Sequence, residues 1–232
     1  MSFIVAKDIK KYYGDKTSLV KALDGINFEI ENGELVVILG ASGAGKSTML
    51  NILGGMDHPT SGEYIVDDVD VTSLSEKDLA LFRRYDIGFV FQFYNLMPNL
   101  TALENIELAE SVAKNPMKSF DALKMVGLEH RRNNFPSELS GGEQQRISIA
   151  RALVKKPKIL LCDEPTGALD SKTGRLVLEQ ILQINKNEKK TVIIVTHNAS
   201  ISLIANRVIK MKDGQIISND VQTPKGIEDI TW

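Results

Sequence analysis

The chain has 232 residues, with 28 lysines and arginines against 30 aspartates and glutamates, which gives a formal net charge of −2. This length fits one large domain with its own hydrophobic core, and the near-neutral charge argues against a protein that binds nucleic acid through a broad basic face. Cys162 is the only cysteine, which excludes an intramolecular disulfide and a zinc site built from cysteines.

The apolar segments of the chain are all short. The first one, at residues 3–6, is too short to form the apolar core of a signal peptide. No apolar run approaches the roughly 18 residues that a bilayer-spanning helix needs. We therefore expect a cytosolic protein, and any role at a membrane has to come through a partner.

The beginning of the chain has the pattern of antiparallel strands. Residues 1–34, together with about 61–72, alternate between apolar and polar side chains. Turns are predicted at Gly14, Asn32-Gly33 and Ser61-Gly62. The two segments predict an antiparallel β subdomain that is added to the core of the fold.

Four short apolar runs predict strands that are buried on both faces of a sheet. The runs lie at residues 35–39, 87–91, 159–162 and 192–196. Helices are expected to begin at Gly45, near Ser140, near Ser171 and near Asn198. Strands that alternate with helices indicate an α/β fold with a mostly parallel sheet.

Two further segments complete the predicted organisation of a single domain. Residues from about 93 to 140 have no strong β pattern and predict helices over 101–113 and 117–126, which we interpret as an inserted helical subdomain. Residues 219–232 are polar and broken by a proline and a glycine, so we expect a surface tail. Trp232, at its end, has no role that the sequence assigns.

Residues 40–47 carry the phosphate-binding pattern G-x-x-x-x-G-K-[ST], between a predicted strand and a predicted helix. Glycines let the backbone fold tightly, so that its N–H groups converge on phosphate oxygens, and the helix N-terminus adds a favourable dipole. Lys46 is expected to reach the β- and γ-phosphates and the Ser47 hydroxyl to bind Mg²⁺. The residues that would hold the nucleotide are Gly40, Ala41, Ser42, Gly43, Ala44, Gly45, Lys46, Ser47 and Thr48.

An acidic pair ends the third apolar run. In P-loop enzymes an acidic residue at a strand end holds the magnesium ion, and we assign this role to Asp163. Glu164 stands one residue further along, where it can direct a water molecule at the γ-phosphate as general base. Such a pair is common on its own, but behind a phosphate-binding loop it is the expected partner.

Residues 139–143 begin another predicted helix, with Ser140 as its N-cap. The hydroxyl of Ser140 and the amides of Gly141 and Gly142 form a second phosphate-binding helix start on the same chain. One nucleotide does not obviously need two of them. In a two-fold dimer each one can close over the nucleotide of the other chain, so we expect a homodimer.

In their order along the chain, these motifs resemble the ATP-binding subunit of an ABC transporter over nearly the whole length. Further features support the resemblance: the Q-loop glutamine Gln92, the D-loop Ala168-Leu169-Asp170 and the switch histidine His197. The resemblance implies a P-loop NTPase core of the RecA-like type. It also implies an ATPase with ATP and Mg²⁺ as its ligands.

The resemblance assigns roles to single residues. Gln92 would touch Mg²⁺ and the attacking water, His197 would contact the γ-phosphate, and Asp170 would cross the dimer interface. Tyr12 would stack on the adenine. Tyr13 stays an alternative, because two adjacent tyrosines leave the register open.

The residues after Gln92 resemble one branch of the family. This branch contains macrolide exporters, lipoprotein-release ATPases, the cell-division ATPase and Gram-positive antimicrobial-peptide-resistance transporters. In such proteins the segment after the Q-loop contacts the coupling helix of the permease. The residues that would face a permease here are Phe93, Tyr94, Leu96 and Met97.

We therefore expect an ATPase at the cytoplasmic face of the cell membrane, held there by its permease. It would serve export or extracytoplasmic handling of peptide, antibiotic or lipoprotein substrates. Two alternatives stay open: a force-transmitting regulatory ATPase of a membrane complex, and a soluble ABC ATPase that acts on nucleic acid or ribosomes. Proteins of the second kind usually carry a coiled-coil insertion or two fused halves. This chain has one set of motifs and a mildly negative charge, so we expect no nucleic-acid partner.

Overall fold

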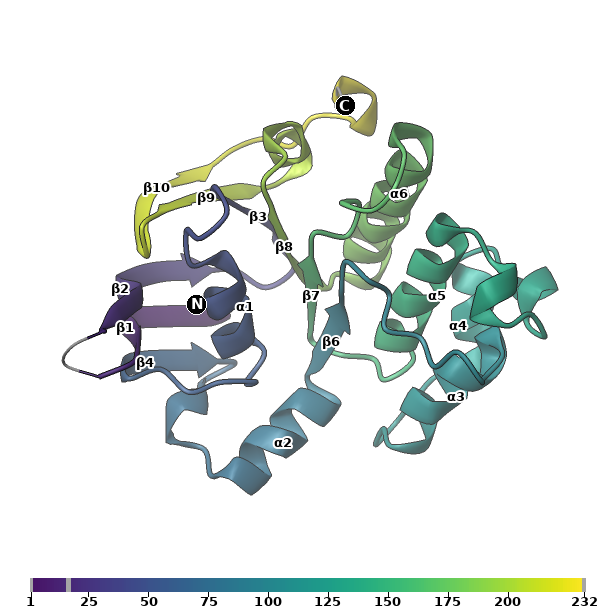
Figure 1. Cartoon of the computed structure of the whole chain (residues 1–232), viewed down its shortest axis with the longest axis horizontal. Helices are drawn as coiled ribbons and strands as arrows, with labels where there is room; N and C mark the ends of the chain where they lie inside the picture. The colour runs from purple at the N-terminus through teal and green to yellow at the C-terminus, as the bar shows by residue number, and fades with distance from the viewer. Residues whose placement is uncertain (1, 16–17, 231–232) are drawn as a thin grey trace.

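The structure is a computed structural model that describes residues 2–15 and 18–230. A six-stranded sheet runs through its centre in the order β10-β9-β3-β8-β7-β6 (Figure 1). Its strands are β3 (Leu35–Leu39), β6 (Ile87–Val90), β7 (Ile159–Asp163), β8 (Thr191–Thr196), β9 (Arg207–Lys212) and β10 (Gln215–Val221). All neighbouring pairs are parallel except β9 with β10, which confirms the α/β class with a mostly parallel sheet.

The central strands are buried on both faces. On β3, Val36 and Ile38 belong to one hydrophobic core, whereas Leu35 and Val37 belong to the other. Strand β8 alternates in the same way. Burial on both faces explains why these strands are nearly continuous apolar runs in the sequence.

A second, antiparallel sheet covers one of these cores, with its strands in the order β2-β1-β4-β5. The strands are β1 (Ile4–Tyr13), β2 (Val20–Ile30), β4 (Ser61–Val66) and β5 (Val69–Asp70). Figure 1 shows helix α1 (Lys46–Leu53) between this sheet and the central one. Its buried side chains, Met49 and Leu50 among them, pack with both sheets in one core.

Helices cover the other face of the central sheet. Figure 1 shows α3 (Ala102–Ser111), α4 (Ser119–Met125) and α5 (Gly141–Leu153) grouped at one end, with α6 (Ser171–Glu188) beside α5. Helix α2 (Glu76–Tyr85) carries no prediction from the sequence, because only two of its side chains are buried and its apolar stripe is narrow. Within the part of the chain that the structure describes, no helix has the length and apolar character to cross a bilayer.

The helix predicted near Asn198 begins there and is of the 3-10 type. Residues Ala199–Ile204 form a 3-10 helix and not an α-helix. The Asn198 side chain accepts a hydrogen bond from the backbone N–H of Ser200 at 3.0 Å, which tightens the first turn. The segment then ends before β9, which begins at Arg207.

The predicted surface tail is largely exposed, but both of its described ends belong to the fold. Residues 219–221 complete strand β10, and Ile230 is only 2% exposed in the core beside α6. The Arg175 guanidinium of α6 donates to the Ile230 carbonyl at 3.1 Å. Ile227 also packs against this core. Two isoleucines in a polar segment give no periodic pattern that would predict such an anchor. Trp232 lies outside the described residues.

Candidate functional site

A cavity of about 530 Å³ lies beside the ends of the parallel strands β3, β7 and β8. The carboxyl ends of parallel strands meet at one edge of a sheet, so residues that follow different strands come together there. The predicted residues that line the cavity are Ser42, Gly43, Gly45, Lys46, Ser47, Thr48, Gln92, Asp163, Glu164 and His197. Four separate motifs of the sequence therefore meet in one hollow.

The phosphate-binding loop is held between two other parts of the backbone. Gly45 has a φ of +96°, and a Cβ there would lie 2.4 Å from the carbonyl oxygen of Ala22, so the position requires glycine. A Cβ on Gly40 would lie 2.7 Å from the carbonyl oxygen of Met211. Helix α1 begins directly after the loop, at Lys46, so its unpaired N–H groups are available to an anion.

Lys46 is almost buried in this cavity, with 8% of its surface exposed. Its Nζ donates to the carbonyl oxygens of Gly40 at 2.8 Å and Ala41 at 2.9 Å. Burial and the negative charge of Glu164 raise the pKa of the Asp163 carboxyl, and the charge of Lys46 opposes them. Two adjacent carboxylates in a partly buried hollow favour a bound cation.

The Glu164 side chain is fixed by the end of β8. Its Oε1 accepts from the His197 backbone N–H at 2.9 Å and from His197 Nδ1–H at 2.8 Å. Its Oε2 accepts from the Thr196 hydroxyl at 2.9 Å. A carboxylate with three donors cannot turn freely, so it can hold a water molecule in one orientation. Because Nδ1 serves Glu164, the Nε2 atom of His197 is left for another partner.

The segment after Gln92 is joined to two other elements. A Cβ on Gly167 would lie 2.9 Å from Gln92 Nε2, so the glutamine packs against the turn that follows the acidic pair. Arg151 of α5 donates to the backbone carbonyl of Tyr94 at 2.8 Å and to that of Asn95. The Gln92 segment thus connects the cavity to the helical part of the molecule.

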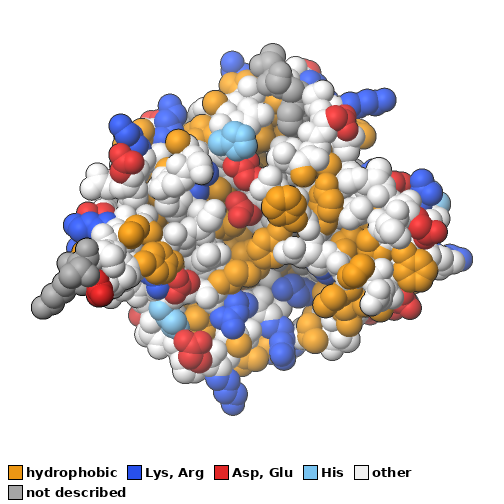
Figure 2. Space-filling view, viewed as in Figure 1, with side chains coloured by type: hydrophobic (Ala, Val, Ile, Leu, Met, Phe, Trp, Pro, Cys, Tyr) orange, Lys and Arg blue, Asp and Glu red, His pale blue; other side chains and the backbone are white. Residues whose placement is uncertain are grey.

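An apolar surface lies beside this segment. Figure 2 shows hydrophobic side chains gathered over the segment after β6 and over helices α3 to α5. Of the residues predicted to face a permease, Phe93 is 74% and Met97 is 55% exposed. Tyr94 is half-buried, with its hydroxyl close to Gly141. Leu96 is also half-buried and packs against the helical core.

The second predicted phosphate-binding segment does not line the cavity. Its residues Ser140, Gly141 and Gly142 lie at the start of α5, where Ser140 is the N-cap. A Cβ on Gly142 would lie 2.0 Å from Thr173 Cγ2, so α5 and α6 begin in close contact. Asp170 caps α6 by accepting from the Thr173 backbone N–H at 3.1 Å. These residues form a separate surface with its own hollow of about 280 Å³.

The two adjacent tyrosines have different partners. The Tyr12 hydroxyl donates to the Asp24 carboxylate. The Tyr13 hydroxyl donates to Asp57 at 2.9 Å and lies beside the Thr48 side chain. Neither tyrosine is part of the cavity wall, but Tyr13 contacts the helix that continues the phosphate-binding loop.

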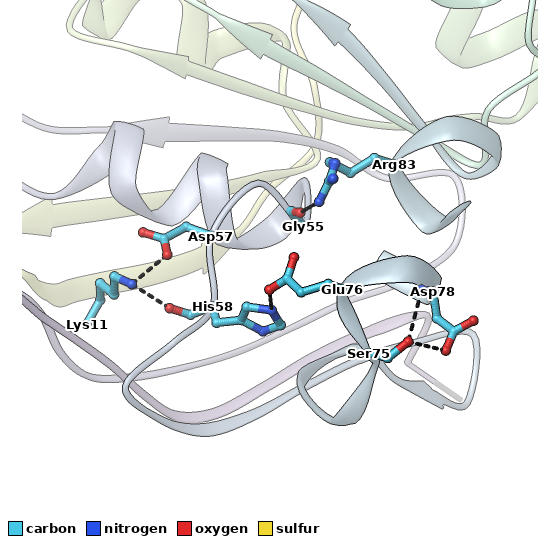
Figure 3. A network of polar contacts seen from close by, with 8 residues as sticks. All are labelled: Lys11, Gly55, Asp57, His58, Ser75, Glu76, Asp78 and Arg83. Atoms are coloured by element: carbon cyan, nitrogen blue, oxygen red, sulfur yellow. Dashed lines mark hydrogen bonds and ion pairs between the residues drawn. The ribbon is translucent and has the colours of Figure 1, made fainter. Parts of the chain in front are cut away.

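The loop after α1 holds Asp57 in place (Figure 3). Lys11 donates to the Asp57 carboxylate at 2.6 Å and to the His58 carbonyl at 2.7 Å. His58 Nε2 lies 2.9 Å from the Glu76 carboxylate at the start of α2. Burial opposes the ionisation of Asp57, but the hydrogen bonds from Lys11 and Tyr13 outweigh it and hold the Asp57 pKa below its usual value.

Part of the cavity wall carries no motif in the sequence. The residues concerned are Val20, Lys21, Ala22, Asp213 and Gly214. The last two form the turn between β9 and β10, and the Gly214 N–H donates to the Ala44 carbonyl at 3.2 Å. An Asp-Gly pair is a hairpin signal. Nothing in the sequence indicates that this hairpin packs on the phosphate-binding loop.

Comparisons with known proteins agree with these motifs. A family model described as "ABC transporter" matches residues 23–167. MJ0796, an uncharacterized ABC transporter ATP-binding protein of Methanocaldococcus jannaschii, is 45% identical over 222 residues, which are 92% of this chain and 94% of that protein. The lipoprotein-releasing system ATP-binding protein LolD of Syntrophus aciditrophicus is 44% identical, over 93% of this chain and 99% of LolD. The macrolide export ATP-binding/permease protein MacB of Mannheimia succiniciproducens is 44% identical, over 97% of this chain and 36% of MacB.

A solved structure has the same fold. It is the dimeric structure of a post-hydrolysis state of the ATP-binding cassette MJ0796 bound to ADP and Pi. The TM-score is 0.86 and the sequence identity 41%, with 96% of this chain and 100% of that chain covered.

Proposed function

The chain belongs to the ABC transporter family, and from this premise we propose that it is an ATP-hydrolysing homodimer that drives a separate membrane permease. One observation carries the proposal. Six residues of the phosphate-binding segment line the cavity, namely Ser42, Gly43 and Gly45 to Thr48, whereas Ser140 and Gly142 line a separate hollow of the same chain. A two-fold dimer brings the second segment of each chain over the nucleotide of the other, which makes two composite sites. The dimeric structures of MJ0796 support this arrangement.

Hydrolysis in such a site needs positioning and charge neutralisation more than covalent chemistry. In our proposal Lys46 moves from the carbonyls of its own loop to the β- and γ-phosphates. Glu164, held by the end of β8, orients the attacking water and accepts its proton. His197 contacts the γ-phosphate through a ring N–H, because a phosphate oxygen can only accept, and Asp170 lies at the interface of the two chains.

The cavity also fits a magnesium ion. The Ser47 hydroxyl, the Gln92 amide oxygen and the Asp163 carboxylate are oxygen donors in the wall of one hollow, and oxygen is the ligand that Mg²⁺ prefers. A cation there would offset the burial that raises the pKa of Asp163. When bound, the ion would neutralise negative charge on the phosphates.

For the adenine we propose Tyr13, which lies beside Thr48, next to the phosphate-binding loop. Tyr12 stays the alternative, because Lys21 of the cavity wall lies 5.3 Å from its ring. Tyr13→Ala is expected to weaken ATP binding roughly tenfold, since stacking on an aromatic ring contributes about 1–3 kcal/mol per base. Tyr12→Ala is expected to change the affinity much less. Titration with a fluorescent ATP analogue measures both. Tyr13→Phe keeps the ring and serves as the control, and a larger loss for Tyr12→Ala would reverse the assignment.

The apolar surface around Phe93 and Met97 is the proposed contact with the permease. Exposed apolar side chains that gather in one region commonly mark a binding surface. The names of LolD and MacB describe lipoprotein release and macrolide export. We extend this to export or extracytoplasmic work for our chain, which then acts at the cytoplasmic face of the membrane through its permease.

Isolation of the assembled complex tests this proposal. Tagged protein with Glu164→Gln is expressed in the native host, ATP is added, and the membranes are solubilised gently. We expect a permease with few transmembrane helices and a large extracytoplasmic domain to co-purify. A permease with a many-helix bundle would favour a conventional transporter, and recovery of ribosomes or DNA alone would overturn the membrane role.

A matched pair of variants makes this test specific. Phe93→Asp, on the proposed contact surface, is expected to lose the permease but still bind ATP. Ile217→Asp places the same charge at a 61% exposed position on β10 and is expected to retain the permease. Equal recovery with both variants would show that the surface near Phe93 is not the contact.

A further inference from the structure

A negative charge lies at the start of α5, where the proposed function places the ATP of the partner subunit. Glu143, in the first turn of this helix, accepts from the Ser140 backbone N–H at 2.9 Å and from the Ser140 hydroxyl at 2.8 Å. A serine hydroxyl has one proton to donate. Ser140 therefore uses on Glu143 the proton that a phosphate oxygen would need.

Arg131 compensates this charge. It ends the 3-10 helix Glu129–Arg131, between α4 and α5, and its Nε donates to the Glu143 carboxylate at 2.8 Å. The Glu143 side chain is only 14% exposed. Burial opposes its ionisation, but the hydrogen bonds from Ser140 and Arg131 outweigh this and hold the Glu143 pKa below its usual value. The carboxylate is therefore negative at neutral pH.

An uncompensated carboxylate at this position would repel a triphosphate. Like charges a few ångströms apart repel each other strongly where water is partly excluded, as it is when two chains close on a nucleotide. With Arg131 in place the pair is neutral as a whole. The Ser140 hydroxyl can then turn from Glu143 to a phosphate oxygen, and Glu143 keeps a charged donor.

We propose that Arg131 is a positioning residue of the composite site: its ion pair with Glu143 neutralises the start of α5 and releases the Ser140 hydroxyl for the γ-phosphate of the partner's ATP. This inference rests on the proposed function, since it needs two chains that close on ATP. It adds a residue that lies outside every motif described above.

A double-mutant cycle tests the coupling. All four chains carry Glu164→Gln, so that hydrolysis does not remove the ATP-bound dimer, and they combine Arg131 or Arg131→Gln with Glu143 or Glu143→Gln. The measured quantity is the ATP concentration for half-maximal dimerisation, from light scattering after size exclusion. In the chain that keeps Glu143, Arg131→Gln is expected to raise this ATP concentration roughly tenfold, which is the size of effect typical of a lost hydrogen bond to a charged group. In the Glu143→Gln chain the same change is expected to have less than about a twofold effect, because no charge is left to neutralise.

Three controls accompany the cycle. Arg132→Gln removes the adjacent positive charge, whose guanidinium lies 6.0 Å from the Phe120 ring, and is expected to dimerise like the parent. Arg131→Lys keeps the charge and is expected to restore most of the dimerisation. Thermal melting and ATP binding to the monomer show that the fold and the phosphate-binding loop are intact.

Two results would overturn the inference. One is an equal effect of Arg131→Gln with and without the Glu143 charge, which would indicate a structural role unrelated to that charge. The other is the absence of any effect on dimerisation. If the parent chain itself fails to dimerise with ATP, the proposed function is contradicted at its base, and the two failures are thereby distinguished.

Discussion

Replacing Glu164 with glutamine is expected to lower ATP turnover roughly 10²- to 10⁴-fold, the usual contribution of a positioned general base. The amide is close in shape to the carboxylate: its oxygen can still accept from the His197 backbone N–H, while its NH2 group can donate to the Thr196 hydroxyl oxygen. It cannot take a proton from water at neutral pH. The position of the side chain is therefore kept while its basicity is lost. Phosphate release under saturating ATP measures the change.

The Glu164→Gln variant has to lose ATP turnover without losing ATP binding. We expect Glu164→Gln to bind ATP about as tightly as the unchanged chain and to accumulate as an ATP-dependent dimer in size-exclusion chromatography. The matched control is Glu179→Gln, which makes the same change on α6, away from the cavity, and is expected to keep full turnover. Equal turnover in Glu164→Gln and the unchanged chain would remove Glu164 from the role of general base.

Replacing Lys46 with alanine is expected to weaken ATP binding roughly 100-fold or more, because hydrogen bonds to charged groups contribute about 1.5–3 kcal/mol each and Lys46 would make more than one to the phosphates. The ammonium is nearly buried and already fixed by the carbonyls of Gly40 and Ala41. Little rotational freedom is therefore lost when it binds a phosphate. Isothermal titration with ATP measures the affinity.

The control for this variant is Lys210→Ala, which removes an exposed lysine on β9. Lys210→Ala is expected to leave ATP binding unchanged. This result would show that the loss of one positive charge alone does not cause the weaker ATP binding of Lys46→Ala. A melting temperature close to that of the unchanged chain would show that Lys46→Ala still folds. If Lys46→Ala bound ATP with an affinity within about threefold of that of the unchanged chain, the assignment of Lys46 to the phosphates would be contradicted. The loss of more than one hydrogen bond to a charged group has to cost more than that.

The sequence predicts the central part of the fold well, because its physical signals are strong there. The runs at 35–39, 87–91, 159–162 and 192–196 each overlap a parallel strand, shifted by one residue at most at either end. Continuous apolar runs of this length result from burial on both faces, and few other structures require them. By contrast, β10 is largely exposed, and its mixed pattern carries no comparable signal.

The choice between Tyr12 and Tyr13 shows a limit of sequence patterns. Alternation along a strand tells which residues share a face only while the strand is regular. Strand β1 has a register shift between Lys11 and Tyr12, so the parity counted from the buried Ile9 does not hold at the tyrosines. The partner of Tyr13 becomes visible only when the loop that carries Asp57 is placed beside it, and the partner of Tyr12 only when β2, which carries Asp24, is paired with β1.

The motifs likewise identify the chemistry of the site but not all of the residues that surround it. Both predicted phosphate-binding segments are evident in the sequence, and so is the acidic pair. The ion pair of Arg131 with Glu143 joins residues of different elements, and neither local composition nor periodicity indicates it. The same holds for the Asp213-Gly214 turn in the cavity wall. Such contacts depend on the tertiary fold, which patterns in short stretches of sequence do not reveal.

The β9–β10 hairpin supports the phosphate-binding loop, although it contains no recognisable motif. His197 is the last residue of any motif, so a protein that stopped soon after it would contain every recognisable part of the ATPase. It would lack the Met211 carbonyl that lies against Gly40 and the Gly214 amide that bonds to Ala44. The loop for the phosphates would then have solvent where it now has a wall. A premature stop codon soon after the codon for His197 would therefore remove this wall and two strands of the central sheet, although it would delete none of the residues that the motifs assign to ATP.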